Sequence, residues 1–198
     1  MSNGLNGKNV AILIENGFEQ VEMTASREAL DEAGAETSIV SPQERKVKGW
    51  EVKKWGRSFK VDVRLSESNA EDYDALLLPG GVMNPDKLRA NQQAVAFVKS
   101  FVDAGKPIAA ICHGSWTLIE TGMVKDSRMT SYTSIKTDIK NAGAEWIDEE
   151  VVVDNGLVTS RSPSDIPAFN NKMIKEFGEG VRQHETNPEH AMAGSRRH

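Results

Sequence analysis

The sequence lacks several features that would direct it to particular classes of protein. It has one cysteine, Cys112, in 198 residues, which excludes an internal disulfide and makes a reducing, cytoplasmic location the simplest expectation. No apolar run approaches the length of a membrane span, and residues 1–7 contain no signal-peptide core. The net charge is −5, which favours neither an anionic membrane nor nucleic acid. We therefore expect no membrane association and no specific nucleic-acid partner.

Cofactor motifs are also missing. No G-x-G-x-x-G sequence follows a predicted strand, so a dinucleotide site is not supported. Three histidines, His184, His190 and His198, lie in a charged tail without a predicted scaffold, and we expect them to be solvated rather than to bind a metal. The sequence therefore indicates neither a metal nor an organic cofactor.

The apolar segments that are present predict one α/β domain over residues 8–178. Buried strands are predicted at 10–14, 37–41, 74–79 and 108–111, and helices at 19–33, 91–104 and 166–177. Strand, helix and strand in succession indicate a mostly parallel sheet with helices on its faces. Residues 1–7 and 179–198 are predicted to be flexible termini.

Two antiparallel features are predicted at the margins of this sheet. Residues 47–65 read as short antiparallel strands or a hairpin, and their aromatic residues are expected to pack rather than to bind a ligand. Asn155-Gly156 separates two further short strands and is a strong signal for a hairpin turn.

Cys112 lies where a buried strand gives way to a helical segment. A sharp turn there would lift the side chain above the edge of the sheet, and the helix amides beyond it would favour a thiolate. An isolated cysteine is more often a small buried apolar residue. The neighbouring His113 and Gly114, together with the position at a strand end, favour a nucleophile instead.

Two other strand ends supply candidate partners. Glu19 follows the first strand, and a protonated Glu19 could donate a hydrogen bond to the thiolate, although an ordinary carboxylate in the first turn of a helix is the simpler interpretation. Gly80 and Gly81 follow the 74–79 strand, where their amides could form an oxyanion hole or simply a tight turn.

The sequence resembles the ThiJ/PfpI superfamily, and within it the PfpI branch of intracellular proteases and bacterial stress-protein deglycases. The resemblance extends from about Lys8 to Phe177 and is carried by several ordered segments, namely Glu15–Glu19, Leu76–Gly81, Ala110–Gly114, Thr130–Tyr132, Lys140–Glu145 and Glu150–Asp154. It implies a flavodoxin-like, doubly wound sheet sandwiched by helices, similar to class I glutamine amidotransferases, with the cysteine in a nucleophile elbow.

The resemblance also implies roles for individual residues. Cys112 would be the nucleophile, His113 its neighbouring histidine, and Glu19 the carboxylate that contacts the thiol. Gly81, with Gly80 and Gly114, would supply oxyanion amides, and Tyr132 would line the pocket. An acidic residue of a neighbouring subunit, here Asp86, would complete a triad, which implies a homo-oligomer, either a dimer or a hexamer of three dimers. Ser115 and Trp116 replace the proline that usually follows Cys-His-Gly, and Trp116 is predicted to narrow the pocket.

Three functions fit these residues. The leading one is a cysteine-dependent stress-response hydrolase that acts on small reactive carbonyl compounds or on glycated proteins and peptides. The second is an intracellular cysteine peptidase. The third is a redox-sensing or chaperone stress protein that uses oxidation of Cys112.

Overall fold

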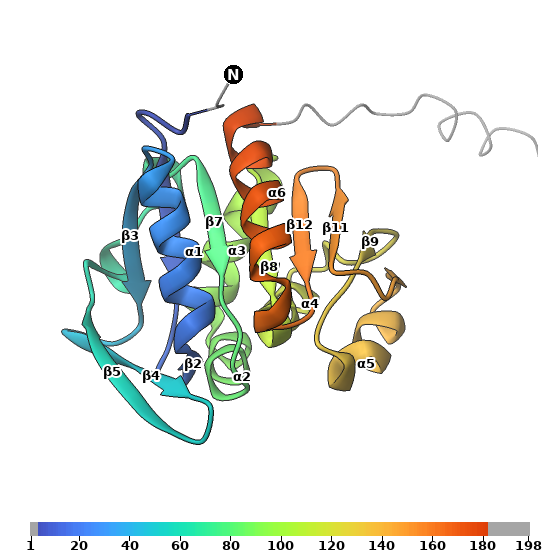
Figure 1. The fold of residues 1–198 in the computed structure, drawn as a ribbon, viewed down its shortest axis with the longest axis horizontal. Helices are drawn as coiled ribbons and strands as arrows, with labels where there is room; N and C mark the ends of the chain where they lie inside the picture. The colour runs from blue at the N-terminus through green and yellow to red at the C-terminus, as the bar shows by residue number, and fades with distance from the viewer. Residues whose placement is uncertain (1–3, 182–198) are drawn as a thin grey trace, which may run out of the picture.

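A computed structural model describes residues 4–181, and its centre is a seven-stranded sheet (Figure 1). The strands follow the order β11-β12-β8-β7-β1-β3-β6, and all neighbours are parallel except β11 and β12. In chain order they are β1 (Asn9–Leu13), β3 (Glu36–Ser41), β6 (Val63–Arg64), β7 (Ala75–Leu78), β8 (Ile108–Ile111), β11 (Val151–Asp154) and β12 (Leu157–Ser160).

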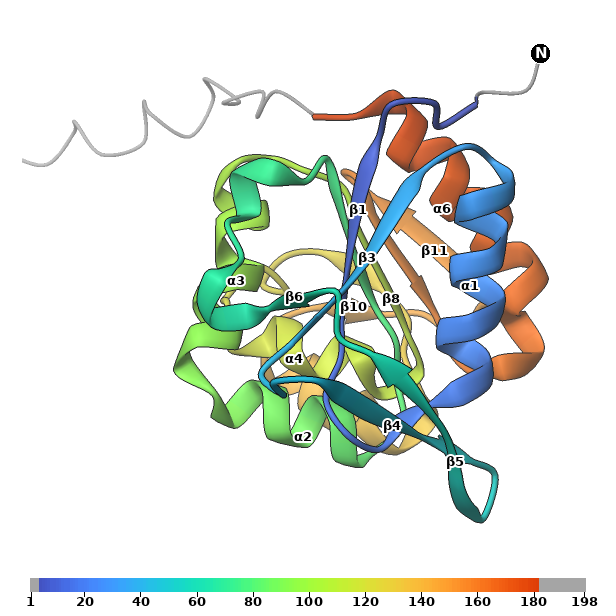
Figure 2. The same ribbon diagram turned by 90° about the vertical axis from the view of Figure 1, so that its left-hand side faces the viewer.

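Helices cover both faces of the sheet. The α-helices within residues 4–181 are α1 (Gln20–Glu32), α2 (Met83–Ala90), α3 (Gln92–Asp103), α4 (Trp116–Ile119), α5 (Lys136–Asn141) and α6 (Ile166–Glu179). Helices α1 and α6 pack together on one face, whereas α2, α3 and α4 lie on the other (Figure 2). This arrangement confirms the predicted α/β sandwich with a mostly parallel sheet.

The alternation of side chains along each strand divides the core into two layers. In β1, Ala11 and Leu13 face the cluster that contains Phe97 of α3, because residues two apart in a strand point the same way. Val10 and Ile12 face the opposite cluster, which includes Phe169 of α6. Strands covered on both faces are apolar throughout, which explains why these segments were recognisable as continuous runs.

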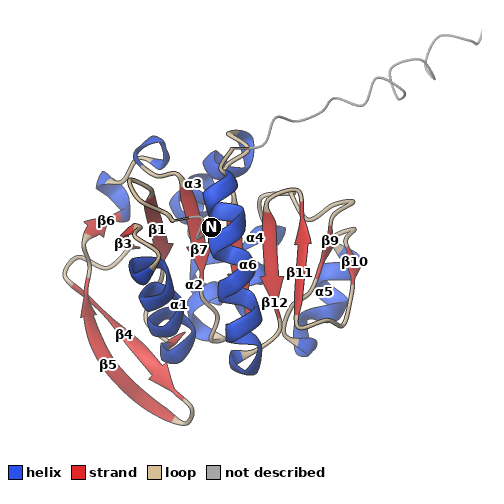
Figure 3. Cartoon of the chain, turned by 45° about the horizontal axis from the view of Figure 1, so that its top comes forward, coloured by secondary structure: helices blue, strands red, loops and turns tan. Residues whose placement is uncertain are grey.

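Two small sheets complete the structure. One joins β9 (Arg128–Met129) to β10 (Glu145–Trp146) beside α5 at one end of the molecule (Figure 3). The other contains β2 (Phe18–Glu19), β4 (Lys46–Glu51) and β5 (Lys54–Lys60). Strands β4 and β5 form the predicted hairpin, which extends away from the body of the protein (Figures 1 and 2).

Several details differ from the sequence prediction. Helix α2 was not predicted, because Pro85 and the polar residues around it obscure its periodicity. Leu5 is fully buried and its amide bonds to the carbonyl of Ala33, so the described part of the N-terminal segment is packed rather than loose. The tail predicted to be flexible falls largely outside the described residues, as do its three histidines. None of the described helices is long and apolar enough to cross a membrane.

Candidate active site

The carboxyl end of strand β8 carries Cys112 in a strained conformation. Its φ of 62° lies in the left-handed region, which non-glycine residues adopt at a cost of about 1–3 kcal/mol. The chain continues into a single turn of 3-10 helix, Cys112–Ser115, and then into α4. This is the sharp strand-to-helix turn that the sequence predicted, and it aims the thiol at a pocket of about 510 Å³.

Glycines permit this turn to approach the end of β7. A Cβ atom on Gly114 would lie 2.2 Å from the carbonyl oxygen of Leu78, and one on Gly80 would lie 2.7 Å from Cβ of Cys112. Gly81 has a φ of 76°, and its amide points at the sulfur of Cys112 together with the amide of His113. These glycines therefore bring two loops into contact around the sulfur atom.

The side chain of Asn84 holds the loop that contains Gly80 and Gly81 in place. It is fully buried, with Nδ2 donating to the carbonyls of Pro79 and Gly80 and Oδ1 accepting from the amide of Glu15. The loops that follow β1 and β7 are thus joined by one amide side chain. Asn84 was not predicted as a site residue, since an asparagine beside a proline and glycines is more often part of a turn.

Glu22 is the carboxylate beside the thiol, and the prediction of Glu19 for this place was wrong. Glu22 is fully buried on α1, accepts a 2.8 Å hydrogen bond from the amide of Gly80 through Oε2, and contacts the thiol of Cys112. Glu19 lies at the pocket wall, where its carboxylate accepts from the backbone of Val52 in the hairpin. The two differ because α1 begins at Gln20, so that a residue in its first turn faces the sheet whereas Glu19 precedes the helix.

Burial raises the pKa of Glu22 to about 8, so its carboxyl group is largely protonated at neutral pH. The other oxygen, Oε1, is buried and accepts no hydrogen bond from any described residue. The protonated carboxyl group of Glu22 contacts the side chain of Cys112, and it can donate a hydrogen bond to the sulfur once that sulfur is negative. The amide of Gly80 is already bound to Glu22, and it is not available as the predicted oxyanion donor.

Burial, and next the carboxylate form of Glu22, also raise the pKa of Cys112, and the amides of His113 and Gly81 oppose that effect. The expectation of a thiolate favoured by the following helix is therefore not met, because α4 contains only four residues and the sulfur is almost enclosed. A group that accepts the thiol proton is needed instead.

His113 is placed to accept that proton. Its Nδ1 lies 3.3 Å from Sγ of Cys112, and its Nε2 lies 2.9 Å from Oγ of Ser134. Burial lowers the pKa of His113, so the ring is neutral at pH 7. If Nε2–H donates to Ser134, Nδ1 is the acceptor that faces the thiol. Ser134 was not predicted, because it lies in an exposed turn of 3-10 helix, Thr133–Ile135, and has no sequence signal of its own.

The aromatic residues predicted for the pocket have different positions. Tyr132 lines the pocket and stacks on His113 with 4.6 Å between ring centroids. Trp116 is not among the lining residues, because its indole donates to Asp138 and its ring lies under Arg89. The tryptophan at the wall is Trp50, from the hairpin that was expected only to pack. Asp86 is exposed on α2 and does not line the pocket of its own chain.

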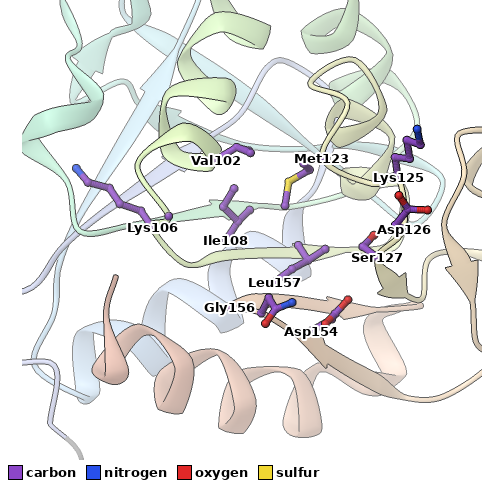
Figure 4. A pocket seen from close by; sticks show the side chains of 12 residues that line it. Val102, Lys106, Ile108, Met123, Lys125, Asp126, Ser127, Asp154, Gly156 and Leu157 are labelled. Atoms are coloured by element: carbon purple, nitrogen blue, oxygen red, sulfur yellow. The ribbon is translucent and has the colours of Figure 1, made fainter. Parts of the chain in front are cut away.

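A second cavity of about 280 Å³ lies at the opposite edge of the sheet (Figure 4). Its floor is apolar, formed by Val102, Ile108, Met123 and Leu157, and charged residues including Lys125 and Asp126 stand at its rim. It contains neither cysteine nor histidine. Within the described part of the chain, a cysteine, a histidine and a buried carboxyl group therefore meet only at the carboxyl edge of the sheet. That part of the chain contains no cluster of metal-ligating side chains.

Comparison with known proteins places these features in a family. The model of the DJ-1/PfpI family matches residues 8–176. This chain belongs to the DJ-1/PfpI family. The structure is similar to that of a two-domain protein with DJ-1/ThiJ/PfpI-like and ferritin-like domains from Anabaena variabilis ATCC 29413, with a TM-score of 0.81, 36% identity, and coverage of 91% of this chain and 51% of that one. The predicted family and fold class are thereby confirmed.

Three relatives align with this chain over nearly their whole length. Protein/nucleic acid deglycase 2 of Escherichia coli (strain K12) is 43% identical over 86% of this chain and 98% of its own. General stress protein 18 of Bacillus subtilis (strain 168) is 43% identical over 85% and 96%. YraA of the same organism, provisionally named as a cysteine protease, is 42% identical over 84% and 96%. These names support the predicted class, a cysteine-dependent stress-response hydrolase.

Proposed function

We propose that this protein hydrolyses adducts of small reactive carbonyl compounds, using Cys112 as its nucleophile. The observation that carries the proposal is the contact of Cys112 Sγ with His113 Nδ1 at 3.3 Å, with the buried carboxyl group of Glu22 behind the sulfur. The deglycase name of the E. coli relative supports this substrate class.

The first chemical step uses these groups in turn. His113 Nδ1 takes the thiol proton, and Sγ attacks the adduct carbon, so that a C–S bond to Cys112 forms while the bond from that carbon to the adducted thiol or amine breaks. Glu22 donates a hydrogen bond to the sulfur while it carries negative charge. The leaving thiol or amine takes the proton from His113. Water then attacks the same carbon, the C–S bond to Cys112 breaks, one proton of the water returns to the thiolate through His113, and the carbonyl compound leaves as its hydrate. Ser134 holds the imidazole in the tautomer that this sequence requires.

The experiment compares purified wild type with Cys112→Ser in the turnover of methylglyoxal and of its adducts with N-acetylcysteine and N-acetylarginine. We expect consumption by wild type and none by the variant, because an alcohol is far harder to deprotonate than a thiol. Equal rates in the two proteins would reject the proposal. Cys112-dependent cleavage of an unfolded protein, without adduct turnover, would support the peptidase alternative instead.

The protein is also proposed to act in the cytoplasm as a homo-oligomer, with Asp86 of a neighbouring subunit reaching His113. Asp86 is exposed on α2 beside the pocket-lining residues Val82 and Met83, a position that suits a contact between subunits. Light scattering of wild type and Asp86→Asn tests the assembly, and the rates of the two proteins test the catalytic contact. A monomeric wild type would reject the oligomer, and an Asp86→Asn protein with an unchanged rate would reject the catalytic contact of Asp86.

A further inference from the structure

The β4–β5 hairpin carries most of the unbalanced positive charge of the protein. Residues 46–60 contain six cationic side chains, Lys46, Lys48, Lys53, Lys54, Arg57 and Lys60, and one acidic side chain, Glu51. The hairpin therefore has a charge of +5 in a chain whose net charge is −5, and the remaining residues together carry −10. The net charge of the whole chain conceals this separation of positive and negative charge. The expectation of no nucleic-acid partner, which was based on that net charge, therefore does not apply to the hairpin.

These cations are exposed, and few have a partner. Of these six cations, Lys54 alone forms an ion pair with a described residue, a 3.8 Å contact with Glu51. Lys48 and Arg57 lie over the rings of Trp55 and Phe59, contacts that leave their charges unneutralised. Lys46 stands directly opposite Lys60 in the antiparallel ladder, a pairing of like charges that destabilises a sheet. A surface that keeps such a pair without neutralising it is suited to an anionic partner.

Aromatic side chains lie among the cations. Trp55 is 45% exposed, packs edge-on against Trp50 at 5.5 Å, and has the ammonium group of Lys48 5.7 Å above its ring. Flat aromatic faces beside cations are the surface on which the bases of single-stranded nucleic acid stack while its phosphates are neutralised. A purely acidic peptide would make no use of the exposed indole.

The hairpin is continuous with the active site. Trp50 lines the pocket of Cys112, and β4 pairs with β2 so that Trp50 stands opposite Glu19. The side chain of Gln20, at the start of α1, accepts from the amide of Arg57. A strand bound along the hairpin would therefore end at the pocket mouth.

We propose that the β4–β5 hairpin is a docking surface for single-stranded nucleic acid, which it delivers to Cys112. The delivery part rests on the proposed function, since it assumes that adducts are processed at this pocket. The docking part does not.

The experiment measures binding of a fluorescein-labelled oligothymidylate about 20 nucleotides long by anisotropy over a series of salt concentrations. Wild type is compared with K46Q/K48Q/K60Q, with Trp55→Ala, and with K125Q/K140Q/K172Q, which removes three exposed lysines elsewhere. We expect the hairpin triple variant to reduce the slope of log K against log salt by about 2, since each phosphate contact contributes about 0.7. Trp55→Ala should weaken binding about tenfold, and the control triple variant should bind as wild type does.

Four results would overturn the docking proposal. The first is that wild type does not bind the oligonucleotide, and the second is that both triple variants bind it equally weakly. The third is that polyglutamate competes as well as unlabelled oligonucleotide does and Trp55→Ala has no effect. The fourth is that the hairpin substitutions dissociate an oligomer of the protein. The last would make the surface a contact between copies of this chain.

Failure of the proposed function is distinguishable, because anisotropy requires no turnover. The hairpin triple variant should consume the N-acetylcysteine adduct at the wild-type rate but show a raised KM for a methylglyoxal-treated oligonucleotide. An unchanged KM would reject delivery while leaving docking in place.

Discussion

The two edges of the central sheet differ in how completely their polar groups are satisfied. At the edge shown in Figure 4, Lys106 donates to the carbonyls of Ala70 and Tyr73, and Asp154 accepts from the amide of Arg128. At the opposite edge Cys112 has a positive φ, and Glu22 keeps a buried oxygen without a partner. Both edges have a cavity, and both carry non-glycine residues with positive φ, since Asp126 (φ 63°) and Asn155 (φ 46°) line the cavity of Figure 4. Aspartate and asparagine adopt this conformation more readily than other residues, whereas at the other edge it is imposed on a cysteine beside a buried carboxyl group. That combination, rather than the presence of a cavity, is what we expect of a reactive site.

The largest effect is expected where the elbow touches strand β7. Gly114→Ala places a Cβ atom 2.2 Å from a backbone oxygen that cannot move freely, and we expect a loss of about 3 kcal/mol or more with loss of activity. Gly122→Ala is the control, because its φ is 77° but its Cβ meets nothing within 4 Å, which should cost about 1 kcal/mol. Urea unfolding measures both. Equal destabilisation would show that close packing does not shape the elbow.

Removal of the base should lower the rate without unfolding the protein. His113→Ala is expected to reduce kcat about 100- to 1000-fold at pH 7, because Nδ1 no longer accepts the thiol proton. Because burial lowers the pKa of His113, the acid limb of the wild-type pH–rate profile should lie below pH 6.5 and be absent from the variant. Met123→Leu, in the other cavity, should leave the rate unchanged. A His113→Ala rate close to that of wild type would remove histidine from the mechanism.

Glu22 and Glu19 form a matched pair for pH-dependent stability. The pKa of Glu22 is about 8 when folded and 4.5 as a free group, so between these values the native state binds more protons than the unfolded state. Stability should therefore fall as pH rises from about 4.5 to 8. Glu22→Gln should remove most of this fall, and Glu19→Gln much less, since Glu19 is only partly buried. Thermal unfolding of the three proteins between pH 4.5 and 8 measures this dependence. If stability falls with pH in Glu22→Gln as steeply as in wild type, Glu22 is not the group that causes the fall.

The smallest effect is expected at Ser134. Ser134→Ala removes the hydrogen bond to Nε2 of His113. The imidazole should then be a mixture of tautomers, and kcat should fall about three- to tenfold. Ser134→Thr keeps the hydroxyl group and should restore most of the rate. If Ser134→Ala has wild-type kinetics, another group orients the ring.

Much of the fold could be predicted because short, continuous sequence patterns determine it. Val10–Ile14 and Ile108–Ile111 are continuous apolar runs, which only doubly covered strands require, and Asn155-Gly156 fixes its hairpin through positive φ angles. Cys112 was recognisable for the same reason, since strand, cysteine and glycine are adjacent in sequence.

The partners of Cys112 were harder to predict, because they depend on how α1 is rotated. Glu19 and Glu22 are one helical turn apart, and only the exact start of the helix decides which of them faces the sulfur. Ser134 and Asn84 reach the site from distant segments through contacts that have no sequence pattern. Trp50 and Trp116 exchanged their expected roles, because the hairpin bends toward the pocket while α4 directs its indole to Asp138.

The most direct test of the account follows the reactivity of Cys112 with iodoacetamide, measured by intact mass at pH 7 in wild type, Glu22→Gln and Glu19→Gln. The protonated carboxyl group of Glu22 donates to the forming thiolate more strongly than an amide does, so Glu22→Gln should react about tenfold more slowly. Glu19→Gln, whose carboxylate is bound to the hairpin, should react as wild type does. Slow reaction of Glu19→Gln together with a normal rate for Glu22→Gln would contradict the site described by this structure.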